Sequence, residues 1–189
     1  MATVSLSLDE IYKLANKTLL ANGCDQETAD ILSELITNAE RDGSLSHGLF
    51  RLPAYVSGLK SGKINGKQKP DIKKLTPSVI KADGKNCLAP VVLNKSIPEL
   101  VKAAKENGVA VLAIINSHHM AAMWPETEKI ADEGLVAFAC TSYKPAVAPA
   151  GAIKPLFGTN PISFAWPRKN NTPVAVSYTH LTLPTKEGV

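Results

Sequence analysis

The spacing of apolar residues predicts three helices in the N-terminal part of the chain. Ser7 and Glu10 form an S-x-x-E capping box, after which apolar residues recur at helical spacing as far as Gly23. Asp25 is expected to cap a second helix that ends near Asp42-Gly43. A third apolar stripe then predicts a helix that begins just after His47; its members are Leu49, Leu52, Tyr55, Val56 and Leu59.

Later segments alternate between extended and helical patterns. The run PSVIKADG (77–84) reads as an extended segment, and a second capping box at Ser96 and Glu99 predicts a helix that ends at Gly108. The continuous apolar runs VAVLAIIN (109–116) and LVAFACTS (135–142) predict strands buried on both faces. The pattern therefore indicates a helical N-terminal region that leads into an α/β region.

Two further segments complete this pattern. A helix is expected from Glu126 to Glu133, with Gly134 as its stop. The stretch PLFGTNPISFAWP (155–167) is expected to form a turn between extended segments.

Composition places the chain among ordinary globular proteins. Its 189 residues suit one domain or one and part of another, and 44% hydrophobic with 20% charged residues argues against disorder. No window resembles a membrane helix, and MATVSLSLDEIYK lacks the pattern of a secretory signal. Three scattered cysteines argue against a disulfide framework, so we expect a cytoplasmic protein.

The modest net charge of +4 gives little support to a nucleic-acid partner. Lysines are densest between Lys60 and Lys74, where six of them accompany a single acid, Asp71. Nucleic-acid surfaces usually interleave such charge with aromatic residues or arginines, and this stretch has neither. We expect a solvated loop.

Candidate chemistry begins with RDGSLSHGLFRLP (41–53). An imidazole such as that of His47 titrates near neutrality and can exchange protons in a reduction. Arg51 falls one turn beyond His47 if a helix begins there, and its guanidinium could bind a substrate carboxylate bidentately. The alternative is that His47 caps a helix and Arg51 forms a surface ion pair.

A second candidate is the pair His118-His119, which directly follows a predicted strand. Functional groups of α/β proteins often occupy that position, although one histidine of the pair could be structural. Adjacent histidines suit zinc poorly, and no C-x-x-C or H-E-x-x-H accompanies them, so we expect no metal site.

The chain lacks G-x-G-x-x-G, G-x-x-x-x-G-K-[ST] and G-x-S-x-G motifs, so a Rossmann fingerprint, a P-loop and a nucleophile elbow are not supported. The sequence Gly158-Thr159-Asn160-Pro161 is a turn with donors for a phosphate, an amide or a carboxylate, or it is a turn alone. From the residues alone, the chain is an α/β protein with a candidate histidine and arginine anion site.

Three segments together resemble the malate/L-lactate dehydrogenase family of NAD(P)-dependent oxidoreductases. They are RDGSLSHGLFRLPAYVSGLKSGKIN (41–65), NSHHMAAMWPETEKIADEGLVAF (116–138) and PAVAPAGAIKPLFGTNPISFAWP (145–167), within a similarity that spans residues 8–176. The motifs NSHH…WPE and KPLFGTNP are most similar to those of the Δ1-piperideine-2-carboxylate/Δ1-pyrroline-2-carboxylate reductases. Such enzymes reduce a cyclic imino acid with NADPH.

The resemblance implies a non-Rossmann nicotinamide-binding fold, a homodimer and a site near a domain boundary. It implies His47 as proton donor with Ser46 beside it, Arg51 as carboxylate ligand, and His119 as the second active-site histidine. It also implies cofactor or substrate contacts; these fall on Ser142, Thr159 and Asn160.

The implied reaction is hydride transfer from NADPH or NADH to C2 of an imino or 2-oxo acid, with the carboxylate held by Arg51 and the proton supplied by an imidazole. One alternative is a dehydrogenase of an open-chain 2-hydroxy acid such as malate, lactate, or a ureidoglycolate- or diketogulonate-like substrate. Another is a non-catalytic binding module in which the histidines are structural. No nucleic acid or membrane partner is expected.

The chain departs from the family at three places. Met120 and Ala121 replace the usual aromatic residue and glycine, and Ser177 stands where an aspartate is expected. Residues 177–189 match nothing in the family and resemble translated adapter sequence, so His180 receives no role. We expect a helical region over 1–75 with the Ser-His-Gly motif, a partial cofactor domain over 76–176 and an artefactual tail. On this interpretation the chain is a C-terminally truncated fragment that binds NADPH poorly and is nearly inactive.

Overall fold

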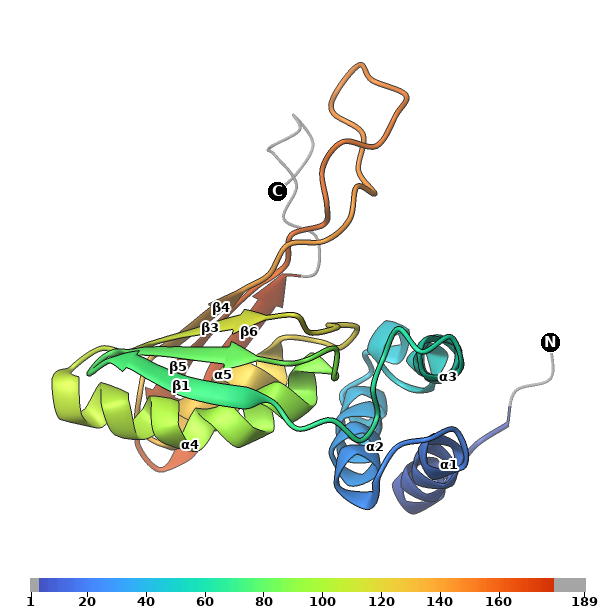
Figure 1. Cartoon of the computed structure of the whole chain (residues 1–189), viewed down its shortest axis with the longest axis horizontal. Helices are drawn as coiled ribbons and strands as arrows, with labels where there is room; N and C mark the ends of the chain where they lie inside the picture. Colours follow the sequence, from blue (N-terminus) through green and yellow to red (C-terminus); the bar gives the residue numbers. More distant parts are fainter. Residues whose placement is uncertain (1–3, 179–189) are drawn as a thin grey trace. The chain divides into compact units, whose positions relative to one another are not determined.

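The computed structural model of the protein (Figure 1) describes residues 4–178. The chain divides into two compact units, Met1–Ala121 and Ala122–Val189. Each unit is described by itself. The division expected at residues 75 and 76 stays a prediction about domains. His180 and the end of the expected tail lie outside the described residues, whereas Ser177 belongs to a strand.

The first unit begins with two helices whose caps were predicted. Helix α1 spans Leu8–Ala21, and its capping box is formed because Glu10 N–H donates to Ser7 Oγ while Ser7 N–H donates to the Glu10 carboxylate. Helix α2 spans Gln26–Arg41, and the Asp25 side chain accepts a hydrogen bond from Thr28 N–H. Both sequence-based starts are confirmed.

The third helix begins later than the apolar spacing predicted. Two short 3₁₀ turns, η1 (Leu45–His47) and η2 (Leu49–Arg51), precede helix α3, which spans Leu52–Lys60. The chain therefore leaves α2, makes two tight turns that carry the Ser-His-Gly motif, and only then continues as an α-helix.

Within the described residues, the sheet of the first unit has the order β1-β2-β3. Strand β1 (Asp71–Thr76) is antiparallel to β2 (Val79–Asp83), and β2 is parallel to β3 (Val111–Ile115). The crossover between the parallel strands is helix α4, Ala89–Asn107, which lies along the sheet (Figure 1). Gly108 ends α4 in the left-handed conformation, as predicted.

The predicted start of that helix at Ser96 is wrong. Helix α4 begins seven residues earlier, at Ala89, and Ser96 lies buried in its interior. An apolar stripe that contains Val91, Val92, Ile97 and Val101 continues through the S-x-x-E pattern, so packing and not a cap determines where the helix begins.

The prediction that 109–116 is a strand buried on both faces is also wrong. The register partners Ile72, Ala82 and Ile114 form one face of the sheet and belong to a cluster with Val92 of α4. The opposite face is open, since Val111 remains 55% exposed. A continuous apolar run indicates that a strand could be buried on both faces. In the described part of the chain, however, α4 covers only one face of this sheet.

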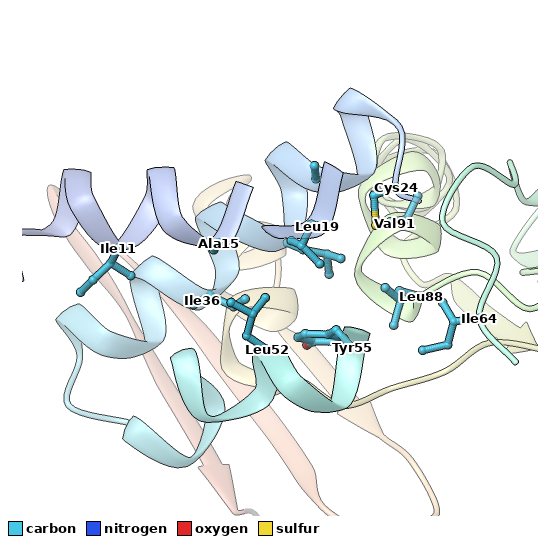
Figure 2. Packing of buried hydrophobic residues seen from close by; sticks show 12 residues of the cluster. Ile11, Ala15, Leu19, Cys24, Ile36, Leu52, Tyr55, Ile64, Leu88 and Val91 are labelled. Carbon is cyan, nitrogen blue, oxygen red and sulfur yellow. The ribbon is translucent and has the colours of Figure 1, made fainter. Parts of the chain in front are cut away.

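A hydrophobic cluster joins the helices to the start of α4. Figure 2 shows side chains from α1, α2 and α3 converging on Leu88 and Val91, with the Tyr55 ring among them. This cluster is the larger core of the first unit, and it supports the two 3₁₀ turns η1 and η2. Its fully enclosed members include Leu19, Leu32, Ile36, Tyr55 and Val91.

In the second unit, helix α5 (Trp124–Asp132) covers a sheet of order β4-β5-β6. The strands span Ala137–Cys140, Ile162–Arg168 and Asn171–Tyr178 and are antiparallel. Thr127 Oγ1 lies 2.7 Å from Ser163 Oγ in the buried layer between helix and sheet. The expected burial of both faces of 135–142 is wrong, because Phe138 is 64% exposed on the face opposite α5.

The lysine-rich stretch is only partly the solvated loop that was expected. Lys73 and Lys74 belong to β1, and Lys69 Nζ makes ion pairs with Asp25 (2.9 Å) and Glu27 (2.6 Å) at the start of α2. Among residues 4–178, no helix combines the length and the apolar character that a membrane crossing requires.

Tyr55 provides a test of this packing. Its hydroxyl is fully buried and has no hydrogen-bond partner among residues 4–178, and burial raises the pKa of Tyr55 well above its usual value. We expect Tyr55→Phe to leave the free energy of unfolding unchanged or raise it by up to about 1 kcal/mol, because an unsatisfied polar group is removed. Tyr55→Ala should lower it by about 3–5 kcal/mol through the cavity. Urea unfolding measures the free energy of unfolding of both variants. A decrease of more than about 1 kcal/mol for Tyr55→Phe would contradict the structure.

Candidate active site

The Ser-His-Gly turn begins where α2 ends. Ser44 N–H donates to Ala39 O (2.8 Å), which closes the end of α2, and His47 N–H donates to Ser44 O (2.8 Å), which forms η1. Gly48 separates the two 3₁₀ turns, and Arg51 N–H returns to Gly48 O (2.9 Å). The backbone of the whole motif is therefore fixed by short-range hydrogen bonds.

His47 is buried, with 9% of its surface exposed, and two serine hydroxyls meet one side of its ring. Ser46 Oγ lies 3.0 Å and Ser44 Oγ 3.2 Å from Nδ1. A hydroxyl can either donate to an unprotonated Nδ1 or accept from Nδ1–H, so this arrangement serves both charge states of the imidazole. Ser44 was missed by sequence reasoning, although its spacing of three residues from His47 is a recognisable signal.

Arg51 is held next to His47 through Ser46. Its Nε donates to Ser46 O (2.7 Å), and its Cζ lies 6.0 Å from the centre of the Phe50 ring. Both side chains contact Ser46, but they are not related by one turn of an α-helix, since α3 begins only at Leu52. The two 3₁₀ turns produce this arrangement instead.

His118 and His119 follow the end of β3, as the sequence predicted. Asn116 turns the chain with φ 50°, and the backbone of His118 then bonds to the segment before α4: its N–H donates to Cys87 O (3.0 Å) and its carbonyl accepts from Ala89 N–H (2.9 Å). Met120, next to His119, packs against the hydrophobic cluster that contains Tyr55. Both histidine segments of the first unit thus rest on one core.

In the second unit, the residues on either side of Ser142 contact the segment that contains Thr159 and Asn160. Tyr143 N–H donates to Asn160 Oδ1 (3.2 Å), and Thr141 N–H donates to Pro161 O (3.2 Å). The crossing is close, since a Cβ added to Gly158 would lie 2.1 Å from Tyr143 O. Residues 158–161 do not form the predicted turn; they run beside Thr141 and Tyr143, the two neighbours of Ser142.

The described residues also bear on metal binding. No group of three or more His, Cys, Asp or Glu side chains that could hold a metal ion occurs within residues 4–178. Cys24 and Cys87 are buried, and burial raises the pKa of Cys24 to about 11, so the thiol rather than the metal-binding thiolate is favoured there.

Comparison with known proteins gives a family match over most of the chain. The family model described as malate/L-lactate dehydrogenase matches residues 6–178. The Δ1-pyrroline-2-carboxylate reductase 1 of Burkholderia ambifaria is 39% identical over 178 residues, which cover 94% of this chain and 52% of that protein.

Solved structures show the same fold. The Δ1-piperideine-2-carboxylate reductase of Pseudomonas syringae superposes with a TM-score of 0.87 at 39% identity, over 94% of this chain and 53% of that one. The malate dehydrogenase of Pyrococcus horikoshii gives a TM-score of 0.86 at 30% identity, over 93% of this chain and 50% of that one.

The chain spans about half the length of these relatives. The matched region nevertheless includes the Ser-His-Gly turn, the His118-His119 segment and the Gly-Thr-Asn segment. This chain, with its α/β fold of the same type, belongs to the malate/L-lactate dehydrogenase family.

Proposed function

We propose that the chain carries substrate- and cofactor-binding residues of an NAD(P)H-dependent oxidoreductase that reduces a cyclic imino acid, of the Δ1-pyrroline-2-carboxylate or Δ1-piperideine-2-carboxylate type. The observation that carries this proposal is the connection of His47 to Arg51 through Ser46, whose hydroxyl contacts the imidazole and whose carbonyl holds the guanidinium. A proton donor and a carboxylate ligand are thereby kept side by side.

Arg51 is the proposed ligand of the substrate carboxylate. Its Nε is engaged by Ser46 O, which orients the guanidinium and leaves the two terminal nitrogens to meet a carboxylate. A planar group fixed in this way holds the substrate's C2 in a defined position relative to His47, and such positioning lowers the barrier for the chemical step.

His47 is the proposed proton donor. Because the two serine hydroxyls occupy the Nδ1 side, an imidazolium keeps its Nδ1–H on a serine oxygen and releases the proton from Nε2. As C2 of the substrate's C=N bond accepts a hydride, the substrate's own ring nitrogen takes this proton from His47. One C–H bond and one N–H bond then replace the π bond. His119 is proposed as a second active-site histidine.

The cofactor is proposed to be NADPH or NADH, with Ser142, Thr159 and Asn160 as its contacts in the second unit. Ser142 and Asn160 suit such a role chemically: Ser142 is exposed and carries a hydroxyl, and Asn160, whose Oδ1 accepts from Tyr143 N–H, also carries amide N–H donors. When bound, the nicotinamide supplies the hydride.

An open-chain 2-oxo or 2-hydroxy acid is the alternative substrate class. Arg51 and His47 would hold and protonate a 2-oxo acid by the same chemistry, and the similarity to a malate dehydrogenase supports this option. The higher identity to the pyrroline-2-carboxylate reductase favours the cyclic imine. Homodimerisation of the whole protein stays a prediction. A non-catalytic module would show neither turnover nor NADPH binding in a fluorescence titration.

The proton-donor role of His47 predicts a loss of turnover on its removal. In a version extended to the full length of the relatives, we expect His47→Ala to lower the rate of NADPH oxidation with Δ1-pyrroline-2-carboxylate by roughly 100-fold or more, since the general acid is lost. The matched control is His118→Ala, which removes an imidazole whose backbone is held by Cys87 and Ala89. Equal rates for the wild type and His47→Ala would refute the role.

The carboxylate-binding role of Arg51 predicts weaker substrate binding for a lysine in its place. A lysine keeps the charge but loses the bidentate geometry, so we expect Arg51→Lys to raise the dissociation constant for Δ1-pyrroline-2-carboxylate roughly tenfold or more. An NMR titration of the amide signals from Ser46 to Leu52 measures it. Arg41→Lys, at an exposed arginine that pairs with Asp42, is the control; an equal effect of the two variants would contradict the assignment.

A further inference from the structure

A carboxylate from α2 reaches across the Ser-His-Gly turn. Glu40, in the last turn of α2, accepts a hydrogen bond from Leu49 N–H at 2.7 Å through Oε1. Leu49 is the first residue of η2, so its N–H has no partner within that turn and needs one from elsewhere. Gly48 precedes it and has no side chain that could serve. Glu40 therefore caps the second 3₁₀ turn from a different helix.

The same carboxylate occupies the space above Gly48. A Cβ added to Gly48 would lie 2.1 Å from Glu40 Oε1, 2.5 Å from Cδ and 2.7 Å from Cγ. Gly48 has φ −86°, so a left-handed backbone does not explain the glycine. The contact with Glu40 does: the glycine of the Ser-His-Gly motif makes room for an acid eight residues earlier.

The position of this contact connects it to the two functional side chains. Gly48 is the junction between η1, which carries His47, and η2, which carries Arg51. Gly48 N–H donates to Leu45 O (3.3 Å) and Gly48 O accepts from Arg51 N–H (2.9 Å), so a shift of this junction moves both turns. Glu40 holds the junction from the helix that is anchored in the hydrophobic core through Ile36.

We propose that Glu40 is a positioning residue for the His47 and Arg51 pair, which it holds in register by capping Leu49 and packing over Gly48. Glu40 acts through the backbone. This inference rests on the function proposed above for that pair.

The first test compares Glu40→Ala and Glu40→Gln in the full 189-residue chain, with Glu34→Ala, an exposed acid of the same helix, as control. Glutamine keeps an acceptor for Leu49 N–H, so Glu40→Gln should resemble the wild type. Glu40→Ala should accelerate hydrogen exchange of the Leu49 amide roughly tenfold or more, leave that of Ile36 unchanged, and shift the His47 ring ¹⁵N signals. Exchange at Leu49 equal to that in Glu34→Ala would overturn the proposal.

The second test is a double-mutant cycle. Gly48→Ala alone should raise the unfolding equilibrium constant roughly tenfold or more, because the methyl group collides with Glu40. In the Glu40→Ala background the same substitution should have a much smaller effect, since the collision is gone. Additive effects of the two substitutions would show that the glycine is not explained by Glu40 and would overturn the proposal.

A third measurement separates this proposal from the proposed function. In Glu40→Ala, but not in Glu40→Gln, the dissociation constant for Δ1-pyrroline-2-carboxylate should rise roughly fivefold or more, as Arg51 loses its register. If His47→Ala and Arg51→Lys both leave binding and turnover unchanged while the exchange and cycle results hold, the proposed function is wrong and the capping contact stands. If Arg51→Lys weakens binding and Glu40→Ala does not, the positioning role is wrong and the function stands.

Discussion

The burial of one apolar cluster between helices α1, α2, α3 and the start of α4 is the constraint on which the candidate site depends. Leu19 and Ile36 from the helical hairpin meet Tyr55 of α3 and Val91 of α4 in this cluster. Helices α1 and α3 have 14 and 9 residues and are marginal alone in water, so packing in this cluster holds them in place. The Ser-His-Gly turn connects two of them, and the His119 segment rests on the same core through Met120. The geometry of the pair His47 and Arg51 is thus set by a core to which neither contributes.

Local signals predicted the first elements well because several of them agreed. At Ser7 and at Asp25, a capping side chain, an apolar stripe and a glycine-terminated end all pointed to the same helix. At Ser96 the capping pattern stood alone against an apolar stripe that passed through it, and the stripe prevailed. The apolar runs at 109–116 and 135–142 were correctly identified as strands. Their burial was not predictable, because a run of apolar residues does not state which elements cover it.

The candidate site was predictable in its residues and less so in its geometry. The motif S-H-G-x-x-R indicated that His47 and Arg51 belong together, but helical periodicity gave the wrong reason for it. Sequence reasoning had no means to find Glu40, since the contact with Gly48 and Leu49 joins separate elements and depends on how α2 ends. In the sequence, such a contact is marked only by a glycine, and in the structure this glycine lacks a left-handed φ.

The candidate site uses two kinds of polar group, a carboxylate and hydroxyls, and their hydrogen-bonding chemistry explains where each is found. The carboxylate of Glu40 is directed at a backbone N–H, where a permanent acceptor is needed in every state. The imidazole of His47 is met by hydroxyls of Ser44 and Ser46, which can reverse their hydrogen bonds when the ring gains or loses a proton. A carboxylate on Nδ1 would favour the charged ring and oppose release of its proton. In the proposed function, the hydroxyls leave the His47 proton transferable, and the Glu40 carboxylate keeps the backbone in place during the transfer.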